Sequence, residues 1–324
     1  MLRTYGPDCD GSPIDPAQAK IPAGATWIDL VEPTRDEEQL VERVVGLDVP
    51  TREEMKEIEP SSRLFERGKA IYMTLSTLYG IEEGKPAAEP IAFVLAGNRL
   101  VTVRYTNPKP FRMFTDHVRR EPELARDALT VLVRLLDTII DRLADELENA
   151  GDEIEKISTQ IFHREEGKSR RIPAERLEAL LRRIGRAQSL LARIRETAVS
   201  SSRVVGFLAA STRLRGDAHE RDHVQSLAAD VGSLIDHSAF LATNLTFLLD
   251  ASLGLISVEQ NAALKVFSVA ALIFLPPTLV AGIYGMNFDH MPELRWLVGY
   301  PWALAIMLLS AVLPYWIFKR NGWL

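Results

Sequence analysis

Two long stretches without a charged residue stand close together near the C-terminus. The first covers residues 266–287 and contains 22 residues, and the second covers residues 296–318 and contains 23. A helix of about 20 apolar residues crosses the ~30 Å hydrocarbon core of a bilayer. A buried helix of a soluble protein could account for one such stretch. Two of them in succession, joined by a short loop, predict a transmembrane hairpin.

The first stretch is not uniformly apolar when it is placed on a helix at about 100° per residue. One side of that helix is bulky and carries Val266, Val269, Ile273 and Val280. The opposite side carries small and polar residues and continues upstream. We call this side the stripe; it comprises Asp250, Ser257, Asn261, Leu264, Ser268, Ala271, Leu275, Thr278 and Gly282. In lipid, such a stripe either packs against another helix or lines a water-filled path.

The residues directly after the stripe favour the water-filled path. Tyr284-Gly285-Met286-Asn287, followed by Phe288, resembles the signature of the CorA family of divalent-cation transporters. The match is specific because the motif stands at the end of the first of two C-terminal spans. Further matching segments are residues 274–278, 291–294, 299–301 and 323–324.

This resemblance implies a transporter for magnesium, with cobalt or nickel as further ions. It implies a homopentamer, and geometry also demands an oligomer, because two spans cannot enclose an aqueous path. The selectivity filter would be Gly285, Met286 and Asn287, with Asn287 and Gly285 contacting the metal ion through its bound water. The pore-lining residues would be Asp250, Asn261, Leu264, Phe267, Ser268, Ala271, Leu275, Thr278 and Gly282. Phe267 lies at the edge of the stripe, so its inclusion rests partly on the resemblance.

The chemistry of magnesium suits these residue types. The ion prefers hard oxygen ligands and dehydrates reluctantly, so a filter can recognise it with its water shell. The amide oxygen of Asn287 and the unobstructed carbonyl of Gly285 accept hydrogen bonds from that water and still release the ion. A helix C-terminal turn capped by asparagine is the structural alternative for the motif, and both can hold.

Along the stripe, apolar and polar positions alternate. Leu264, Phe267, Ala271 and Leu275 are expected to form apolar rings that can gate a pore by dewetting. Between these rings, polar side chains would line the path at Asn261, Ser268 and Thr278.

No phosphate-binding loop, nucleophile elbow or metalloprotease motif occurs, so we expect no enzyme and no cofactor. The membrane potential, at ~2.3 kcal/mol per charge per 100 mV, would drive uptake. The resemblance to the CorA family also implies that magnesium is both the transported ion and a regulator acting from inside the cell. The regulatory sites cannot be assigned by motif, and Asp222, Asp230 and Asp236 are only possible members. An acidic cluster at residues 141–155 is interpreted first as a solvated helix face, and alternatively as a cation-attracting surface.

The charge distribution predicts the orientation. Lys319 and Arg320 follow the second span, whereas the loop between the spans carries Asp289, Glu293 and one arginine. By the positive-inside rule, both termini are cytoplasmic, in a bacterial-type inner membrane. Met1 to Pro22 lacks the apolar core of a signal peptide. A net charge of −6 argues against a nucleic-acid partner, and a single cysteine, Cys9, fits a reducing compartment.

We therefore expect an α+β membrane protein with an N-terminal α/β cytoplasmic domain, a long stalk helix and two C-terminal transmembrane helices. Expected strands cover residues 26–31, 70–78, 91–95 and 99–105, and a capping box opens at Thr51. Trp27-Ile28-Asp29-Leu30 matches the family loosely. The expected parts are residues 1–120 for the α/β domain, 121–263 for the helical region and stalk, 264–287 for the pore-lining helix, 288–295 for the external loop, 296–318 for the second transmembrane helix and 319–324 for the cytoplasmic tail.

Three long helices are expected in the C-terminal two thirds. The first runs from about Leu124 to Phe162, the second from Ala174 to about Leu208, and the third from about Ala218 into the membrane. If it continues to Ile283, the third helix has about 66 residues and a length of about 100 Å. That is too long for a compact domain and indicates a stalk.

Two other functions stay open. A zinc transporter of the same architecture is the nearest, although residues 291–294 favour the magnesium branch. A membrane-anchored scaffold or sensor is the alternative of another class, although an anchor needs neither the stripe nor Asn287. His219 and His223 lie one helical turn apart and could hold zinc, but their neighbours Arg221 and Asp222 favour a solvated face.

Overall fold

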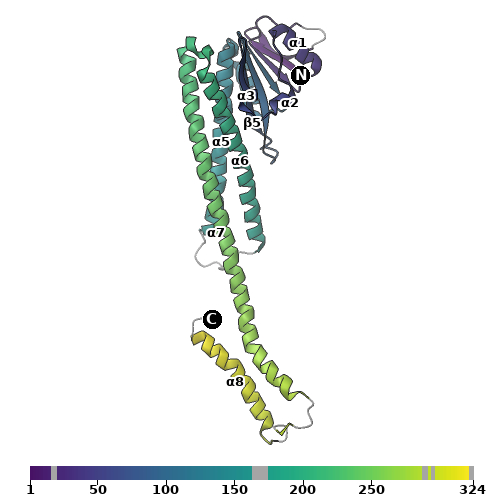
Figure 1. Ribbon diagram of the computed structural model, residues 1–324, viewed down its shortest axis with the longest axis vertical. Coiled ribbons are helices and arrows are strands. Elements are labelled where there is room, and N and C mark those ends of the chain that lie inside the picture. The colour runs from purple at the N-terminus through teal and green to yellow at the C-terminus, as the bar shows by residue number, and fades with distance from the viewer. Residues whose placement is uncertain (16–19, 163–173, 287–290, 293–295, 321–324) are drawn as a thin grey trace. The chain divides into compact units, whose positions relative to one another are not determined.

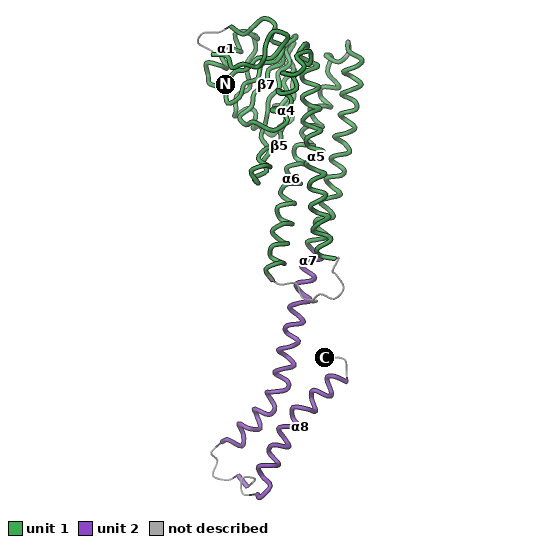
Figure 2. The backbone as a smooth tube through the Cα atoms, turned by 180° about the vertical axis from the view of Figure 1, so that it is seen from behind, with its two compact units in different colours: residues 1–168, 174–249 green, residues 169–173, 250–324 purple. Residues whose placement is uncertain are grey.

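The structure is a computed structural model that describes residues 1–15, 20–162, 174–286, 291–292 and 296–320 (Figure 1). The chain divides into two compact units (Figure 2). Unit 1 comprises residues 1–168 and 174–249, and unit 2 comprises residues 169–173 and 250–324. One helix, α7 (Ala218–Tyr284), has its first part in unit 1 and its last part in unit 2.

Unit 1 is built on a 7-stranded sheet with the strand order β2-β1-β3-β7-β6-β5-β4. All neighbouring strands pair antiparallel except β3 and β7, which are parallel. The strands are β1 (Leu2–Gly6), β2 (Cys9–Ile14), β3 (Trp27–Val31), β4 (Leu64–Arg67), β5 (Ala70–Tyr79), β6 (Ala87–Ala96) and β7 (Arg99–Arg104). The four strands expected from sequence are therefore present, and the turn between β6 and β7 places Gly97 at a positive φ of 61°.

The short helices α1 (Arg35–Val45) and α2 (Arg52–Met55) pack on one face of the sheet (Figure 1). The helix α3 (Pro60–Arg63) precedes β4 and buries no side chain. The expected capping box at Thr51 is confirmed, since its hydroxyl accepts the Glu54 N–H and the Glu54 carboxylate accepts the Thr51 N–H. A second capping box, Thr34 with Glu37, opens α1. Side chains from alternate strand positions, such as Ala92 and Val94 of β6, form the core on this face.

Long helices cover the opposite face, where Ile91, Phe93 and Leu95 of β6 join the larger core. This core draws on α4 (Lys109–Arg120), η1 (Pro122–Ala125), α5 (Ala128–Phe162), α6 (Ala174–Ala210), η2 (Thr212–Gly216) and the first part of α7. The sheet thus lies between two helical layers, which is why its central strands β5, β6 and β7 are buried on both faces.

The expected start of the first long helix was too early. Residues 122–125 form a 3-10 turn, and α5 begins at Ala128. The reason is a side-chain cap: the Asp127 carboxylate accepts the backbone N–H groups of Leu129 (3.0 Å) and Thr130 (3.1 Å). The other two long helices, α6 and α7, begin where they were expected.

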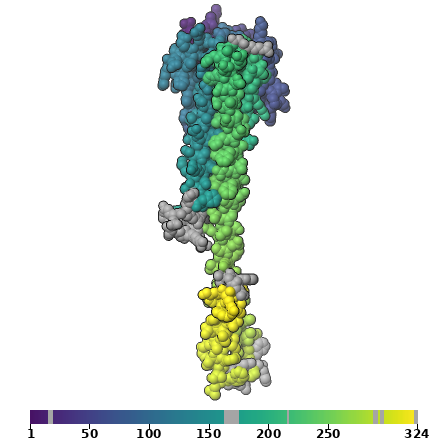
Figure 3. Space-filling view, turned by 90° about the vertical axis from the view of Figure 1, so that its left-hand side faces the viewer, coloured from purple at the N-terminus to yellow at the C-terminus, as the bar shows by residue number. Residues whose placement is uncertain are grey.

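Unit 2 contains the last part of α7 and the helix α8 (Gly299–Arg320), which lie side by side in Figures 1 and 3. Both helices are long and apolar enough to cross a membrane. The helix α7 has 67 residues and contains Pro276 and Pro277, and α8 contains Pro314. This arrangement confirms the expected α+β membrane protein with a long helix and two C-terminal spans.

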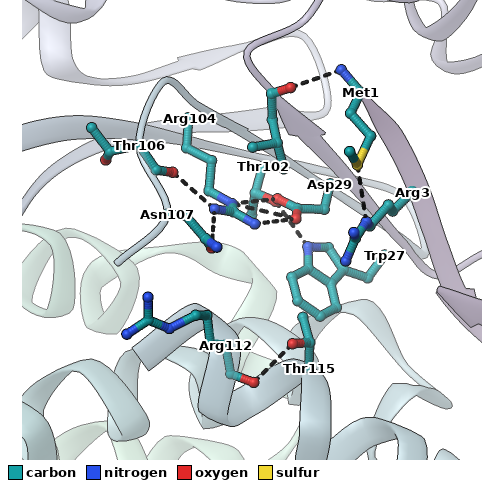
Figure 4. Close-up of polar contacts among 11 residues, drawn as sticks. Met1, Arg3, Trp27, Asp29, Thr102, Arg104, Thr106, Asn107, Arg112 and Thr115 are labelled. Carbon is teal, nitrogen blue, oxygen red and sulfur yellow. Dashed lines mark hydrogen bonds and ion pairs between the residues drawn. The ribbon is translucent and has the colours of Figure 1, made fainter. Parts of the chain in front are cut away.

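A buried ion pair links β3 to β7 on the face of the sheet that the long helices cover (Figure 4). Arg104 Nη2 lies 2.9 Å from Asp29 Oδ2, and the two side chains are 4% and 0% exposed. The Thr102 hydroxyl donates to Asp29 (2.7 Å) and accepts from the Trp27 indole N–H (2.9 Å). Each buried charge therefore has several hydrogen-bond partners, which offsets part of the cost of its burial.

The same guanidinium group shapes the chain after β7. Arg104 Nη1 donates to the Thr106 carbonyl and to the Asn107 side-chain oxygen, both at 2.8 Å. Its guanidinium carbon lies 4.8 Å from the centre of the Phe111 ring in α4. Arg104 thus fixes the turn that leads from the sheet into α4.

Replacing Asp29 with alanine is expected to leave Arg104 buried without its counter-ion and to destabilise the fold by about 3–5 kcal/mol. The matched control is Asp48→Ala, which removes an ion pair to Arg67 whose side chains are 76% and 67% exposed. That loss should cost at most about 1 kcal/mol. Thermal unfolding of the purified full-length variants measures both, and equal melting temperatures would contradict the role given to Asp29.

Candidate ion-conduction site

The stripe lies on the part of α7 that belongs to unit 2, and its side chains are solvent-exposed in the single chain. The side chains of Leu264 and Leu275 are 62% and 72% exposed, and Phe267 is 72% exposed. Of the residues assigned to the opposite side, Val269, Ile273 and Val280 are half-buried and Val266 is 69% exposed. Exposure extends beyond the stripe, since Phe274 and Leu279 are 69% and 65% exposed. Much of this long apolar helix, the stripe included, is therefore left without a partner from the described part of its own chain.

The hydroxyl groups of the stripe have a defined orientation. Ser268 Oγ donates to the Leu264 carbonyl (2.9 Å), and Thr278 Oγ1 donates to the Phe274 carbonyl (2.6 Å). Because each hydroxyl proton is used within the helix, each oxygen presents its lone pairs outward. These two side chains can therefore accept hydrogen bonds, for example from the water bound to a cation.

Two prolines release further acceptors next to Thr278. Pro276 and Pro277 lack a backbone N–H, so the carbonyls of Leu272 and Ile273 receive no bond from the residue four positions later. A helix in a membrane tolerates this only where another group or water satisfies the freed carbonyls. The prolines thus locate a polar section of backbone in the middle of the span.

The first two residues of the expected filter follow the end of α7. The Gly285 N–H bonds to the Ala281 carbonyl (2.9 Å), and the Met286 N–H bonds to the Ile283 carbonyl (3.3 Å). A Cβ on Gly285 would lie 3.1 Å from the Ala281 oxygen, so a side chain would crowd this turn. Asn287 lies outside the described residues, as do positions 288–290 and 293–295 of the loop. The assignment of the filter and of the pore-lining residues stays a prediction.

Most carboxylates of the acidic cluster of α5 are solvent-exposed, as the first interpretation expected, but Glu146 is an exception. Glu146 is 3% exposed and pairs with Arg142, which also pairs with Asp145 at 3.3 Å. Desolvation by the surrounding helices and the nearby carboxylates of Asp137, Asp145 and Asp230 raise the pKa of the exposed Asp141 carboxyl. The i, i+4 spacing along α5 could not distinguish the buried carboxylate from the exposed ones, because the neighbouring helices decide which carboxylates are covered.

The histidine pair on α7 does not form a recognisable metal site. His223 Nε2 lies 3.3 Å from the Asp137 carboxylate of α5, and His219 is exposed. Across the residues that the structure describes, no group of three His, Cys, Asp or Glu side chains is placed to hold a metal ion.

Comparison with known proteins identifies the family. The family model described as CorA-like Mg2+ transporter protein matches residues 22–320. The magnesium transport protein CorA of Salmonella typhimurium is 34% identical over 300 residues, which are 93% of this chain and 92% of the relative. The protein of the same name from Yersinia pseudotuberculosis is 33% identical over 302 residues, with 93% of both chains covered.

Solved structures show the same fold. The complete CorA magnesium transporter of Methanocaldococcus jannaschii superposes with a TM-score of 0.77 at 20% identity, covering 100% of this chain and 98% of that one. The cytoplasmic domain of ZntB from Vibrio parahaemolyticus gives a TM-score of 0.56 at 10% identity, covering 81% and 98%. With the family model matched from the third strand of the sheet to the last helix, the chain belongs to the CorA family.

Proposed function

We propose that this protein is a channel-like transporter that mediates magnesium uptake down the electrochemical gradient. Family membership supports a transporter of ions that is not an enzyme and needs no cofactor. The observation that carries the proposal is the exposed stripe of α7, which ends at Gly285. The energetics also fit: a divalent ion gains about 4.6 kcal/mol on moving inward across 100 mV, so no nucleotide is required.

The protein works as a homo-oligomer, and five copies are proposed by family resemblance. Each chain supplies two candidate spans. A polar face that is directed to lipid is costly, so the stripes of neighbouring subunits meet around a shared aqueous path. Ser268 and Thr278 then present oxygen lone pairs to that path, which suits a hydrated cation.

A ring of Asn287 side chains at the end of the pore is proposed to recognise magnesium with its water shell. Neutral amide and carbonyl oxygens hold the ion weakly enough for release, whereas a ring of carboxylates would hold it too tightly. Gly285 and Met286 complete this filter. Further inside, Leu264, Phe267, Ala271 and Leu275 form apolar rings that close the path by dewetting.

Regulation and placement complete the proposal. The proposed signal for closure is intracellular magnesium. The proposed location is a bacterial-type inner membrane with both termini in the cytoplasm, as the basic residues Lys319 and Arg320 suggest. The domain boundaries expected from sequence, including a pore-lining helix over residues 264–287, belong to the same proposal.

Cobalt and nickel are proposed as further ions on the strength of the family resemblance. A zinc transporter is the second candidate, and the likeness to the ZntB domain favours it only at the level of the fold. The identity of 34% to a magnesium transport protein over 93% of the chain supports magnesium more strongly. A membrane-anchored scaffold is less suitable, because an anchor needs no polar stripe.

The first prediction concerns orientation. In a Cys9→Ser background, a cysteine introduced by His290→Cys should react with a membrane-impermeant thiol reagent in intact cells. A cysteine introduced by Glu66→Cys, at an exposed position of β4, should react only after the cells are opened. Labelling is read by mass shift, and the reverse pattern would place the N-terminal domain outside the cell.

The second prediction concerns the filter. Asn287→Ala should reduce magnesium uptake into proteoliposomes to background, because the ring of amide oxygens is removed. The control Asn149→Ala, at an exposed position of α5, should transport like the unaltered protein. Oligomer size is checked for both, and native flux in a correctly assembled Asn287→Ala protein would remove this residue from the mechanism.

The third prediction separates a pore stripe from a packing stripe. Leu275→Ser should make an apolar ring easier to wet, so basal flux at high internal magnesium should rise several-fold. Ile273→Ser, on the half-buried side of α7, should affect packing and leave the regulation of flux largely unchanged.

The measurement is uptake by proteoliposomes at high and low internal magnesium, with oligomer content determined by size. Should Ile273→Ser open the closed state while Leu275→Ser stays at background, the stripe has been assigned to the wrong face. The assignment of which residues of the first span face the pore would then have to be changed.

A further inference from the structure

Unit 1 contains a cavity of about 460 Å³ beside the hairpin turn between β6 and β7. Its walls come from Pro7 after β1, the turn at residues 23–26, Val45 at the end of α1, positions 96, 98 and 99 of the hairpin, and Arg126 before α5. The volume lies within the range of small-molecule sites, about 300–1,000 Å³. None of these residues belongs to the stripe, so the cavity is separate from the candidate ion-conduction site.

The charged side chains at the wall of this cavity are all positive. Within the described part of the chain, Arg99 and Arg126 line it and no carboxylate does. Arg99 Nη1 donates to the Val44 carbonyl (3.1 Å), and its other N–H groups have no partner among the described residues. The exposed guanidinium group of Arg126 forms no hydrogen bond or ion pair with these residues. Two guanidinium groups thus adjoin one space with most of their donors unused.

The nearest carboxylates do not neutralise this charge. Asp127 is occupied, because its carboxylate accepts the N–H groups of Leu129 and Thr130. Asp8 Oδ2 lies 3.3 Å from the place of a Cβ on Gly24, yet Asp8 forms no ion pair with either arginine in the described structure. The bond from Arg99 to the Val44 carbonyl offsets the partial negative charge at the end of α1. The excess of positive charge is therefore left for a ligand.

Asn98 adds a neutral donor to the same wall. Its Oδ1 accepts the Ala128 N–H (3.2 Å), which leaves the side-chain NH2 group without a partner among the described residues. Because Ala128, Leu129 and Thr130 at the start of α5 already have acceptors for their N–H groups, the attraction does not come from the helix end. It comes from side-chain donors, which are the groups that bind oxyanions most strongly.

The frame of the cavity is formed before any ligand arrives. The Thr26 hydroxyl donates to the Ala125 carbonyl, and the Leu100 N–H donates to the Thr26 carbonyl (2.7 Å). A Cβ on Gly6 would collide with the Gly24 carbonyl oxygen, so the end of β1 and the turn before β3 approach closely. A preformed site loses less conformational entropy on binding than a flexible one.

The remaining wall decides the kind of anion. It consists of small aliphatic residues, among them Pro7, Ala25, Val45 and Ala96, and no aromatic ring lines it within the described residues. A nucleobase would find no ring to stack on there. A phosphate monoester carries close to two negative charges and three acceptor oxygens. Those features match two guanidinium groups and an amide on separate segments better than a planar, singly charged carboxylate does.

We propose that this cavity binds a phosphate monoester with a compact aliphatic body. The phosphate oxygens accept hydrogen bonds from Arg99, Arg126 and the Asn98 amide, and the body packs on Val45 and Ala96. A soluble ester and a lipid headgroup could both supply the phosphate. The few small aliphatic residues of the wall suit the soluble ester.

The test is isothermal calorimetry on the full-length protein in phosphatidylcholine nanodiscs, in buffer without magnesium. The probes are butyl phosphate and butyl sulfate, which have the same shape but differ in charge. At about pH 8 the phosphate ester is a dianion, because its second pKa is about 6. Butyl sulfate should bind with a Kd about tenfold higher, as expected for the loss of one charge-assisted hydrogen bond.

A second arm of the test distinguishes the sources of the phosphate. Butyl phosphate is titrated into the protein in nanodiscs with and without added phosphatidate, a lipid that also carries a phosphate monoester. The Kd should be the same in both. Weaker apparent binding in the presence of phosphatidate would overturn the soluble source and support a headgroup at the same phosphate site.

Variants assign the binding to the cavity. Arg126→Gln should raise the Kd for butyl phosphate about tenfold and leave the melting temperature unchanged, because this guanidinium group has no partner to lose. The matched control is Arg120→Gln, at an exposed position of α4 that does not line the cavity. It should bind both probes like the unaltered protein.

Asn98→Asp separates charge from shape. Aspartate keeps an oxygen for the Ala128 N–H, so the fold should be retained, but it places a negative charge at the wall. The Kd for butyl phosphate should therefore rise at least tenfold. The proposal is overturned if butyl phosphate shows no saturable binding below about 10 mM, an affinity weaker than the millimolar range. It is also overturned if the two probes bind equally, or if Arg126→Gln binds like Arg120→Gln.

Discussion

The structure depends on one constraint of the membrane interior: every backbone N–H and carbonyl must be satisfied where no bulk water is available. A single chain meets this requirement with a helix, and α7 continues without a break from unit 1 into the apolar part of unit 2. Pro276 and Pro277 are the exception within the span, because they free two carbonyls. The same section carries Thr278, whose hydroxyl proton bonds back to the helix. The section of α7 in which two carbonyls lack a helical hydrogen bond is thus also the section in which the Thr278 hydroxyl oxygen presents its lone pairs outward.

The same constraint explains why one chain alone leaves side chains of α7 without a partner. Leu264, Phe267 and Leu275 are exposed, and between them lie polar residues that lipid would not solvate. Apolar rings alone could face lipid, and polar residues alone would suggest an open aqueous channel. Their alternation on one face fits a path that water enters only in part, which is the physical basis of gating by dewetting. The proposed oligomer follows from this face rather than from any contact within one chain.

Much of this architecture could be predicted from sequence where the signal was long and periodic. The starts of α6 and α7 and the strands β5 and β7 were located because each has a sustained pattern or a clear break. The strands β1 and β2 and the helices α1 and α4 were missed, although Thr34 and Glu37 form a capping box as readable as that at Thr51. The start of α5 was misplaced because one side chain, Asp127, decides it. Which carboxylates of α5 are buried depends on packing by other helices, so local spacing could not tell Glu146 from its neighbours.

Two buried threonines show why some features of a fold cannot be read from local patterns at all. Thr77 and Thr197 are far apart in sequence, and neither lies in a recognisable motif. Their hydroxyls become unusual only because the fold buries them without a hydrogen-bond partner in the described part of the chain. Valine matches threonine in shape, so local spacing gives the same strand and helix with either residue, and only the packed layers decide whether a hydroxyl is left without a partner.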